Sequence, residues 1–332
     1  MILARGKISM KINGKNYEII DTLEYITLAD SFIRENKIGA GHGEAKLYVG
    51  NEGERLFNFF GDFKINCFFC KKDFKLFLED SKQEYYNPQQ DYIRSCDMQE
   101  RFDKYYSKIE EISDEILKFQ LYRVDVAPPR VYVNAESEYW TIMRTIALPN
   151  ISYLSVLKLK DDKDNVVYYF KIFIDYKSDI VGYQMPEEKA QEETIEKDEK
   201  ISRKKKDTII RARIGQGKYR EDLLEECPYC PFTLVNDERL LIASHIKPWA
   251  KANNEEKIDP KNGFMLTPTY DKLFDRGFIT FDDDKKVIVS PWLSPMNQKR
   301  LGIYTGLVVS KLPLDEKRKT YLKYHREYVF KS

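Results

Sequence analysis

The chain has 332 residues, which is too long for one ordinary hydrophobic core and suits two domains. Apolar residues make up 42% of the chain and charged residues 33%, a globular composition that excludes an intrinsically disordered protein. The 55 Lys and Arg residues nearly balance 54 Asp and Glu, and the net charge of +1 excludes a uniformly basic nucleic-acid coat protein, although it allows a local basic segment.

The N-terminal segment, the apolar runs and the cysteines indicate where in the cell the protein is expected. The N-terminal segment MILARGKISMKING has no apolar core of signal-peptide length. No apolar run reaches the roughly 20 residues that a membrane span needs. Four of the five cysteines form two C-x-x-C pairs, which is not the pattern of a secreted disulfide framework. We therefore expect a cytoplasmic protein with no membrane partner.

The first 185 residues combine helix and strand patterns. His42 lies in a glycine-rich loop, and apolar residues at helical spacing predict a helix over Met98–Phe119. A short strand is expected at Val131–Val133. Two segments rich in β-branched and aromatic residues, Ser152–Lys160 and Val166–Ile174, flank a polar turn and predict a hairpin. Residues 1–185 are therefore predicted to form a mixed α/β domain.

A charged segment follows this domain. Residues 186–207 contain no aromatic side chain, and their charge is acidic first and basic last, which predicts an exposed linker or a solvated helix. The stretch 203–220 contains eight Lys or Arg residues and one acidic residue, Asp207, and so carries a net charge of +7. A third segment, 208–332, is expected to form the second domain.

Residues 227–281 carry the strongest functional signal. A short apolar strand over Leu240–Ser244 is expected to present His245 at its end. A polar loop closed by Asn262-Gly263 leads to a second strand, Phe264–Leu266, and a helix is expected to begin near Thr269. The predicted order is therefore strand, loop, strand and helix.

Two carboxylates lie on this predicted helix. Asp271 and Asp275 are four residues apart, so both project from one helical face. Two carboxylates opposite a single histidine, His245, suit one hard divalent cation beside a general base.

At these positions the sequence resembles the HNH nucleases. The segment Ser244–Ile246, Asn262 and Asp271 are similar to a branch with the patterns A-S-H-I-x-P-W and N-G-x-x-L-x-x-x-x-D-x-L-F-D-x-G, which is common in restriction-type endonucleases. The resemblance covers about residues 208–330. It implies an α+β protein in which a C-terminal ββα-metal nuclease domain follows a mixed α/β N-terminal recognition domain.

The resemblance also implies roles for individual residues. His245 is the expected general base that takes a proton from the attacking water, and Asn262 is expected to hold the loop and orient the histidine. Asp271 and Asp275 match the positions of metal ligands. Ser244 departs from the pattern, because many HNH proteins have Asp or His there. The remaining oxygen ligands favour Mg²⁺ or Mn²⁺ over Zn²⁺.

The C-x-x-C pairs leave two readings open. In zinc-bearing HNH proteins a pair such as Cys227 and Cys230 is completed by a second pair, but here the matching stretch 267–270 has no thiol. We favour packed thiols. The alternative is a structural Zn²⁺ site in which Cys67 and Cys70 supply the missing ligands.

The basic stretch predicts a contact with double-stranded DNA. A segment of net charge +7 directly before a phosphodiester-cleaving site would attract the phosphate backbone and give salt-dependent affinity. The candidate phosphate contacts are Lys204, Lys205, Arg211, Arg213 and Arg220.

Three functions remain open at this point. The first is a restriction or modification-dependent endonuclease in which residues 1–185 recognise the target and 208–330 cut it, with a homodimer favoured for double-strand cleavage. The second is a defence effector whose N-terminal domain senses a signal and whose cutting is non-specific. The third is a DNA-binding protein with a degenerate nuclease module, which the retained His245, Asn262, Asp271 and Asp275 argue against.

Overall fold

The protein consists of two compact units, Met1–Pro186 and Glu187–Ser332. The structure is a computed structural model that describes residues 9–28, 46–61, 63, 65–88, 97–148, 151–175, 186–213 and 217–332. Both units combine helices with strands, which confirms the predicted α+β class. The glycine-rich loop with His42 and the fifth cysteine, Cys96, lie outside the described residues.

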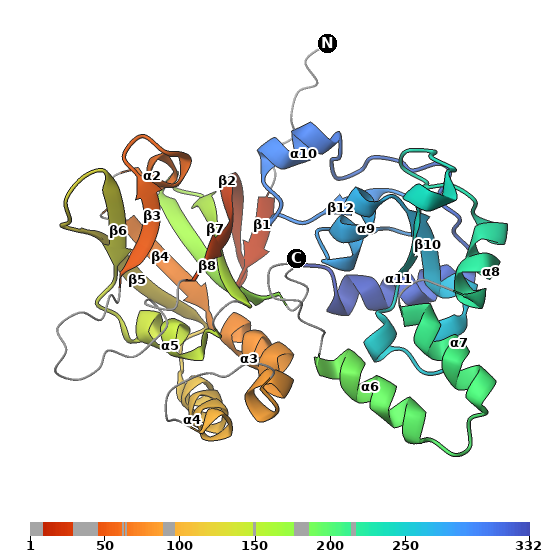
Figure 1. Cartoon of the computed structure of the whole chain (residues 1–332). Helices are drawn as coiled ribbons and strands as arrows, with labels where there is room; N and C mark the ends of the chain where they lie inside the picture. Colours follow the sequence, from red (N-terminus) through yellow and green to blue (C-terminus); the bar gives the residue numbers. More distant parts are fainter. Residues whose placement is uncertain are drawn as a thin grey trace, which may run out of the picture. The chain divides into compact units, whose positions relative to one another are not determined.

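A single mixed sheet organises the first unit (Figure 1). Its strand order is β1-β2-β7-β8-β4-β5-β6-β3, and every neighbouring pair is antiparallel except the parallel pair β4 and β8. The strands are β1 (Ser9–Ile12), β2 (Lys15–Thr27), β3 (Leu47–Asn51), β4 (Ile65–Cys70), β5 (Ile116–Val124), β6 (Arg130–Asn134), β7 (Ser152–Lys160) and β8 (Val166–Ile174).

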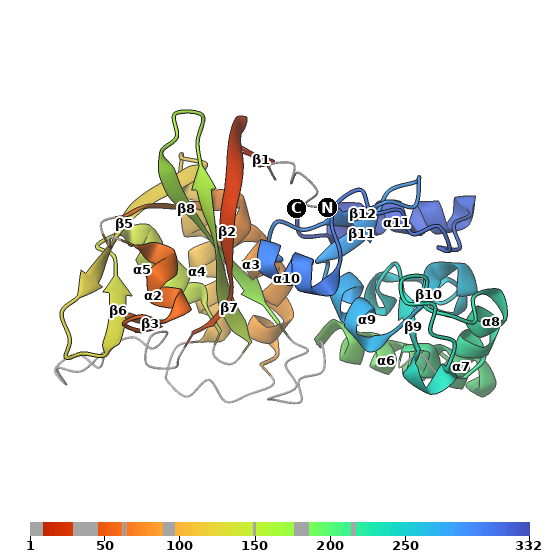
Figure 2. The same cartoon turned by 90° about the horizontal axis from the view of Figure 1, so that it is seen from above.

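Helices cover this sheet and complete its core. They are α2 (Arg55–Phe60), α3 (Lys71–Tyr86), α4 (Met98–Glu111) and α5 (Glu138–Ile146). Helix α3 packs against both α4 and β8, and Figure 2 shows α3 and α4 on the same face of the sheet. Buried aromatic rings, among them Phe69, Phe119, Trp140 and Phe170, contact one another beneath these helices.

The predicted hairpin and one predicted helix had different outcomes. The hairpin is confirmed, because β7 and β8 have the expected bounds and pair along their full length. The helix expected over Met98–Phe119 is wrong in its last third. It ends at Glu111, and Leu117, Phe119 and Leu121 then alternate with exposed residues as the inward face of β5. A period of two over that segment outweighs the helical spacing of its isoleucines.

The second unit is built from short elements. They are α6 (Pro186–Lys197), α7 (Arg203–Arg213), α8 (Lys218–Glu226), β9 (Ile242–His245), β10 (Gly263–Leu266), α9 (Pro268–Asp275), β11 (Ile279–Phe281), β12 (Val287–Val289), α10 (Pro295–Leu301) and α11 (Glu316–Tyr328). Two antiparallel pairs, β9 with β10 and β11 with β12, share one core with α9 and α11. Within the described residues, no helix is long and apolar enough to cross a membrane.

The segment 186–207, expected to be an exposed linker or a solvated helix, is largely helical. It forms α6 and the first half of α7, and Ile195 and Ile209 from these helices are buried with Trp249 in a small apolar cluster. One buried isoleucine on each helix is enough to pack it against the unit, because the charged residues remain on the outer face. The sequence indicated the charged surface of this segment but not the burial of Ile195.

Candidate active site

Two short antiparallel strands and one helix form the frame of the candidate site. Strands β9 and β10 pair in a register that places His245 directly opposite Gly263, and α9 packs against both strands. Pro268 occupies the first turn of α9, where its missing N–H removes no helical hydrogen bond. The strand–loop–strand–helix order expected from the sequence is present in this frame.

His245 is held at the end of β9 by two contacts. Its Nε2 atom lies 3.0 Å from the backbone carbonyl oxygen of Lys257. Because a carbonyl oxygen only accepts, Nε2 carries the proton in the neutral ring and Nδ1 is the basic nitrogen. The ring also stacks on Tyr219, with centroids 4.3 Å apart and planes 5° from parallel. These contacts fix both the tautomer and the orientation of a partly exposed imidazole.

Gly263 is required by the close approach of Tyr219. A Cβ atom at Gly263 would lie 2.2 Å from the Tyr219 hydroxyl oxygen and 3.1 Å from the Ser244 carbonyl oxygen. The fully buried Tyr219 hydroxyl donates a hydrogen bond of 3.2 Å to the Asn262 carbonyl. The glycine therefore leaves the space in which the tyrosine ring supports His245.

Asn262 holds the loop that precedes it. Its side chain is fully buried, and its Oδ1 accepts a hydrogen bond of 2.8 Å from the Lys247 N–H. Its Nδ2 donates to the carbonyls of Lys247 and Glu256, at 3.1 and 3.0 Å. Glu256 directly precedes Lys257, whose carbonyl bonds His245. Asn262 thus fixes the backbone on both sides of the loop, which is consistent with a role in orienting the histidine through that backbone.

Arg318 is a supporting residue that sequence reasoning missed. This guanidinium is 2% exposed and comes from α11. It donates to the carboxylates of Asp315 and Glu226, each at 2.7 Å, and to the carbonyls of Gly263 and Pro260, each at 3.3 Å. A signal did exist, because Arg318 has the same helical face as three other buried residues, listed here as Tyr321, Leu322 and His325.

The two predicted metal ligands lie one helical turn apart on α9. Asp271 and Asp275 are both partly exposed. Among the residues that the structure describes, no group of three or more His, Cys, Asp or Glu side chains is arranged to hold a metal ion. A Mg²⁺ ion commonly takes only one or two protein carboxylates and completes its shell with water and substrate phosphate. Within the described residues, the two aspartates therefore do not belong to a closed protein cage for a metal ion.

The cysteine pairs do not fit a zinc site. Cys67 and Cys70 both lie in strand β4 and are three positions apart, so their side chains point to opposite faces of the sheet. Cys227 and Cys230 are buried thiols, and the Sγ atom of Cys230 lies 3.7 Å from the Thr267 hydroxyl. Cys227 and Cys230 supply only two sulfur ligands, so by themselves they do not complete the tetrahedral set of four that zinc requires.

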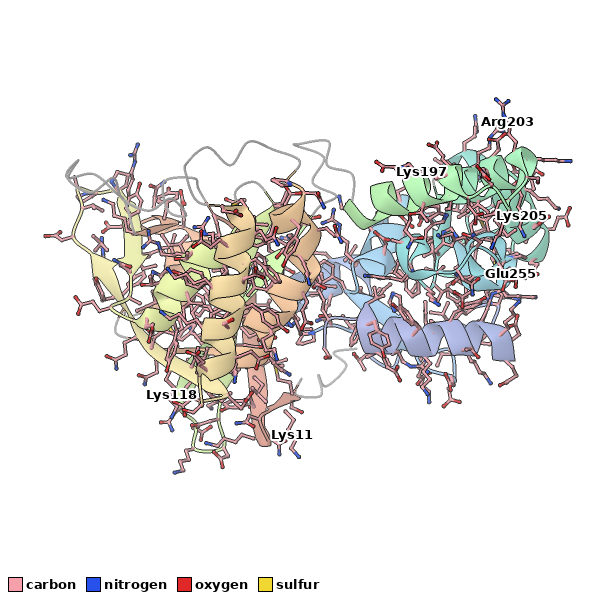
Figure 3. All side chains as sticks on the ribbon, turned by 90° about the horizontal axis from the view of Figure 1, so that it is seen from below. Lys11, Lys118, Lys197, Arg203, Lys205 and Glu255 are labelled. Atoms are coloured by element: carbon pink, nitrogen blue, oxygen red, sulfur yellow. The ribbon has the colours of Figure 1, made fainter. Side chains whose placement is uncertain are left out.

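The predicted phosphate contacts have different surroundings. Lys204, Lys205 and Arg211 are exposed along α7, and Figure 3 shows the neighbouring Arg203 projecting away from the helices. The Arg213 side chain lies outside the described residues. The Arg220 guanidinium instead donates to the carbonyls of Leu241 and Glu238, at 2.9 and 2.6 Å, and so stabilises the turn before β9.

His325 is a structural residue. It is 1% exposed, its Nε2 donates to the Phe274 carbonyl at 3.0 Å, and its Nδ1 therefore accepts from the Thr280 hydroxyl at 2.9 Å. The ring stacks on Phe274 with centroids 4.0 Å apart. Burial lowers the pKa of His325 to about 4, so this ring is neutral in the folded protein near neutral pH.

Comparison with known proteins identifies the segment that contains this frame. Residues 230–282 match the family model of the HNH endonucleases. The C-terminal unit therefore carries an HNH domain, as predicted from the sequence, and the protein is a nuclease, a phosphodiester hydrolase. A comparison with curated proteins found no match.

The buried His325 predicts a loss of stability in acid. Its pKa is about 4 in the folded state against an ordinary value of 6.5, so the unfolded chain binds the extra proton between these two values. The stabilisation is complete above pH 6.5 and declines as the pH falls toward 4. From this group alone we expect the free energy of unfolding to fall by about 2 kcal/mol between pH 8 and pH 5.

Urea denaturation of the full chain at these two pH values measures this difference. The variant His325→Gln keeps a donor and an acceptor without a titrating ring, and it should show a smaller acid loss than the wild type by about the same amount. Equal losses in the two proteins would contradict the assignment.

Proposed function

We propose that the protein is a Mg²⁺- or Mn²⁺-dependent DNA endonuclease, a restriction or modification-dependent enzyme that hydrolyses phosphodiester bonds in double-stranded DNA. One observation carries the proposal. His245 is fixed by the Lys257 carbonyl with Nδ1 as its basic nitrogen, on a hairpin packed against the helix that bears Asp271 and Asp275. A positioned base on a hairpin that packs against a carboxylate-bearing helix suits the activation of water for attack on phosphate.

His245 would act as the general base. Its Nδ1 would accept a proton from the attacking water, and the positive charge that then develops on the ring would be stabilised through Nε2–H by the Lys257 carbonyl. The stacked Tyr219 ring would keep the imidazole from rotating during this transfer. Asn262 and Arg318 would act at one remove, because they hold the backbone around Lys257 and Gly263.

Asp271 and Asp275 would hold the divalent cation. When bound, such an ion would supply Lewis-acid stabilisation of charge on the phosphate and on the leaving oxygen. Both aspartates lie on a short helix that packs on β9 and β10, the strand pair that carries His245. The protein's contribution is thus a rigid placement of one base and two anionic ligands.

DNA would be attracted by the exposed cations of α7. Lys204, Lys205 and Arg211 are free of the backbone contacts that occupy Arg220, so we retain these three as phosphate contacts and leave Arg220 out. The separate eight-stranded unit would select the DNA to be cut. Because one copy of the site contains one histidine base, cutting of both strands favours a homodimer.

Replacement of the base is expected to abolish cutting and to spare binding. In His245→Ala the rate of cleavage should fall by a factor of about 10² to 10⁴, since general base catalysis typically contributes that much. The affinity for a DNA duplex, measured by fluorescence anisotropy in Ca²⁺, should remain within about twofold, because no proposed phosphate contact is changed. Cleavage at the wild-type rate would refute the assignment of the base.

Replacement of a metal ligand is expected to act through metal affinity. Asp271→Ala should raise the Mg²⁺ concentration that gives half-maximal cleavage by about tenfold or more, and Mn²⁺ should restore part of the rate. A matched control is Asp284→Ala, which removes an exposed carboxylate from the turn between β11 and β12. An unchanged Mg²⁺ dependence in Asp271→Ala, with the control also unchanged, would exclude Asp271 as a ligand.

Digestion of methylated and unmethylated copies of one genome tests the biological role. Discrete fragments are expected, from one of the copies only if the enzyme responds to modification and from both if it reads an unmodified sequence. A smear that forms only after a small-molecule signal is added would instead identify a defence effector with non-specific cleavage. The measurement is gel electrophoresis of the products at several Mg²⁺ concentrations.

A further inference from the structure

Lys257 is a buried lysine whose two ends have different partners. Its side chain is 1% exposed, and its Nζ donates to the Gln191 Oε1 atom at 2.7 Å and lies 4.3 Å from the centre of the Trp249 ring. Its backbone carbonyl accepts the hydrogen bond from His245 Nε2. One residue therefore contacts α6 through its side chain and the imidazole through its backbone.

The surroundings of this ammonium are nearly apolar. Trp249 packs against Ile195 of α6 and Ile209 of α7, and its Nε1 donates to the Ile209 carbonyl at 3.0 Å. Burial lowers the pKa of Lys257. An ammonium in such a site depends on each polar partner that it has, because its hydration has been given up.

We propose that Lys257 is a positioning residue through which helix α6 sets the orientation of His245. The hydrogen bond from the Lys257 ammonium to Gln191 keeps the lysine side chain against the Trp249 ring. This in turn keeps the Lys257 carbonyl within hydrogen-bonding distance of His245 Nε2. The inference rests on the proposed role of His245 as general base. It adds a residue and a helix that the matched HNH segment does not contain, since Gln191 lies before residue 230.

Helix α6 is a suitable place from which to control the site. It begins at Pro186, the last residue of the first unit, so it is the segment that follows that unit directly in the chain. A shift of α6 that withdraws Gln191 would remove the hydrogen bond of the ammonium while it remains in an apolar site. Lys257 would then leave its pocket to reach water and carry its carbonyl away from the imidazole. Cleavage would be lost without any change in the metal ligands or the phosphate contacts.

Gln191→Ala in the full chain tests this connection. The kcat for duplex cleavage should fall by a factor of about 10 to 100, because a small displacement of a catalytic group has effects of that size. The KM for DNA should stay within about twofold. The matched control is Glu193→Ala, an exposed residue of the same helix that pairs with Lys197, and it should cut at the wild-type rate.

A second substitution separates positioning from a simple loss of structure. In Gln191→Ala/Lys257→Met no ammonium remains to be stranded, and the methionine fills the same apolar pocket. The double variant should therefore recover to within about threefold of the wild-type kcat. A structural defect in α6 would not be repaired by a change at residue 257. Failure of the double variant to recover, or full activity in Gln191→Ala, would overturn the proposal.

The tautomer of His245 gives a readout that needs no cleavage. With three histidines in the chain, ¹⁵N NMR of the imidazoles can be assigned by substitution. His245 should be an Nε2–H tautomer in the wild type and a mixture in Gln191→Ala. An unchanged tautomer in Gln191→Ala would overturn the connection. If the tautomer changes in Gln191→Ala as expected but the wild type cuts no DNA, the proposed function fails while the connection stands.

Discussion

The hydrogen bond from His245 Nε2 to the Lys257 carbonyl is the interaction around which the second unit is arranged. It decides which ring nitrogen is basic, and it does so with a backbone atom that cannot change its own protonation state. A backbone carbonyl is only as well placed as the loop that bears it. Two buried groups bond at that loop: the Asn262 side chain donates to the Glu256 carbonyl, and the Lys257 ammonium donates to Gln191.

The two described histidines show how similar local contacts give different chemistry. His245 and His325 each place Nε2 at a carbonyl oxygen and each stack parallel on an aromatic ring. His325 is buried within the core and spends its Nδ1 on the Thr280 hydroxyl, which leaves a neutral structural ring. His245 is partly exposed at the end of a strand, where water has access to it. Exposure, rather than the hydrogen bond, distinguishes the proposed base from the core residue.

Much of the frame could be predicted because its signals are local. An apolar strand ending in His245, a loop closed by Asn262 and a helix after Pro268 follow from neighbouring residues in the sequence. The roles of Arg220 and Lys257 could not be predicted in that way, and for Arg318 the only signal was its helical spacing with other buried residues of α11. A cation in a charged segment is expected to face solvent, and only tertiary structure shows that these three donate to carbonyls, carboxylates or an amide inside the unit. For the same reason residues 186–207 resembled an exposed linker or a solvated helix, because the burial of Ile195 depends on Trp249, about fifty residues later.

The proposed catalytic and metal-binding residues and several of the residues that support them lie in different parts of the chain. The segment 230–282 contains His245, Asn262, Asp271 and Asp275, and it matches the HNH family model by itself. Further contacts come from outside it: Tyr219, before the segment, stacks on His245, and Arg318, after it, donates to the Gly263 carbonyl. A two-stranded hairpin is only marginally stable by itself, and packing against helices stabilises it. The flanking helices α8 and α11 supply such packing through Tyr219 and Arg318.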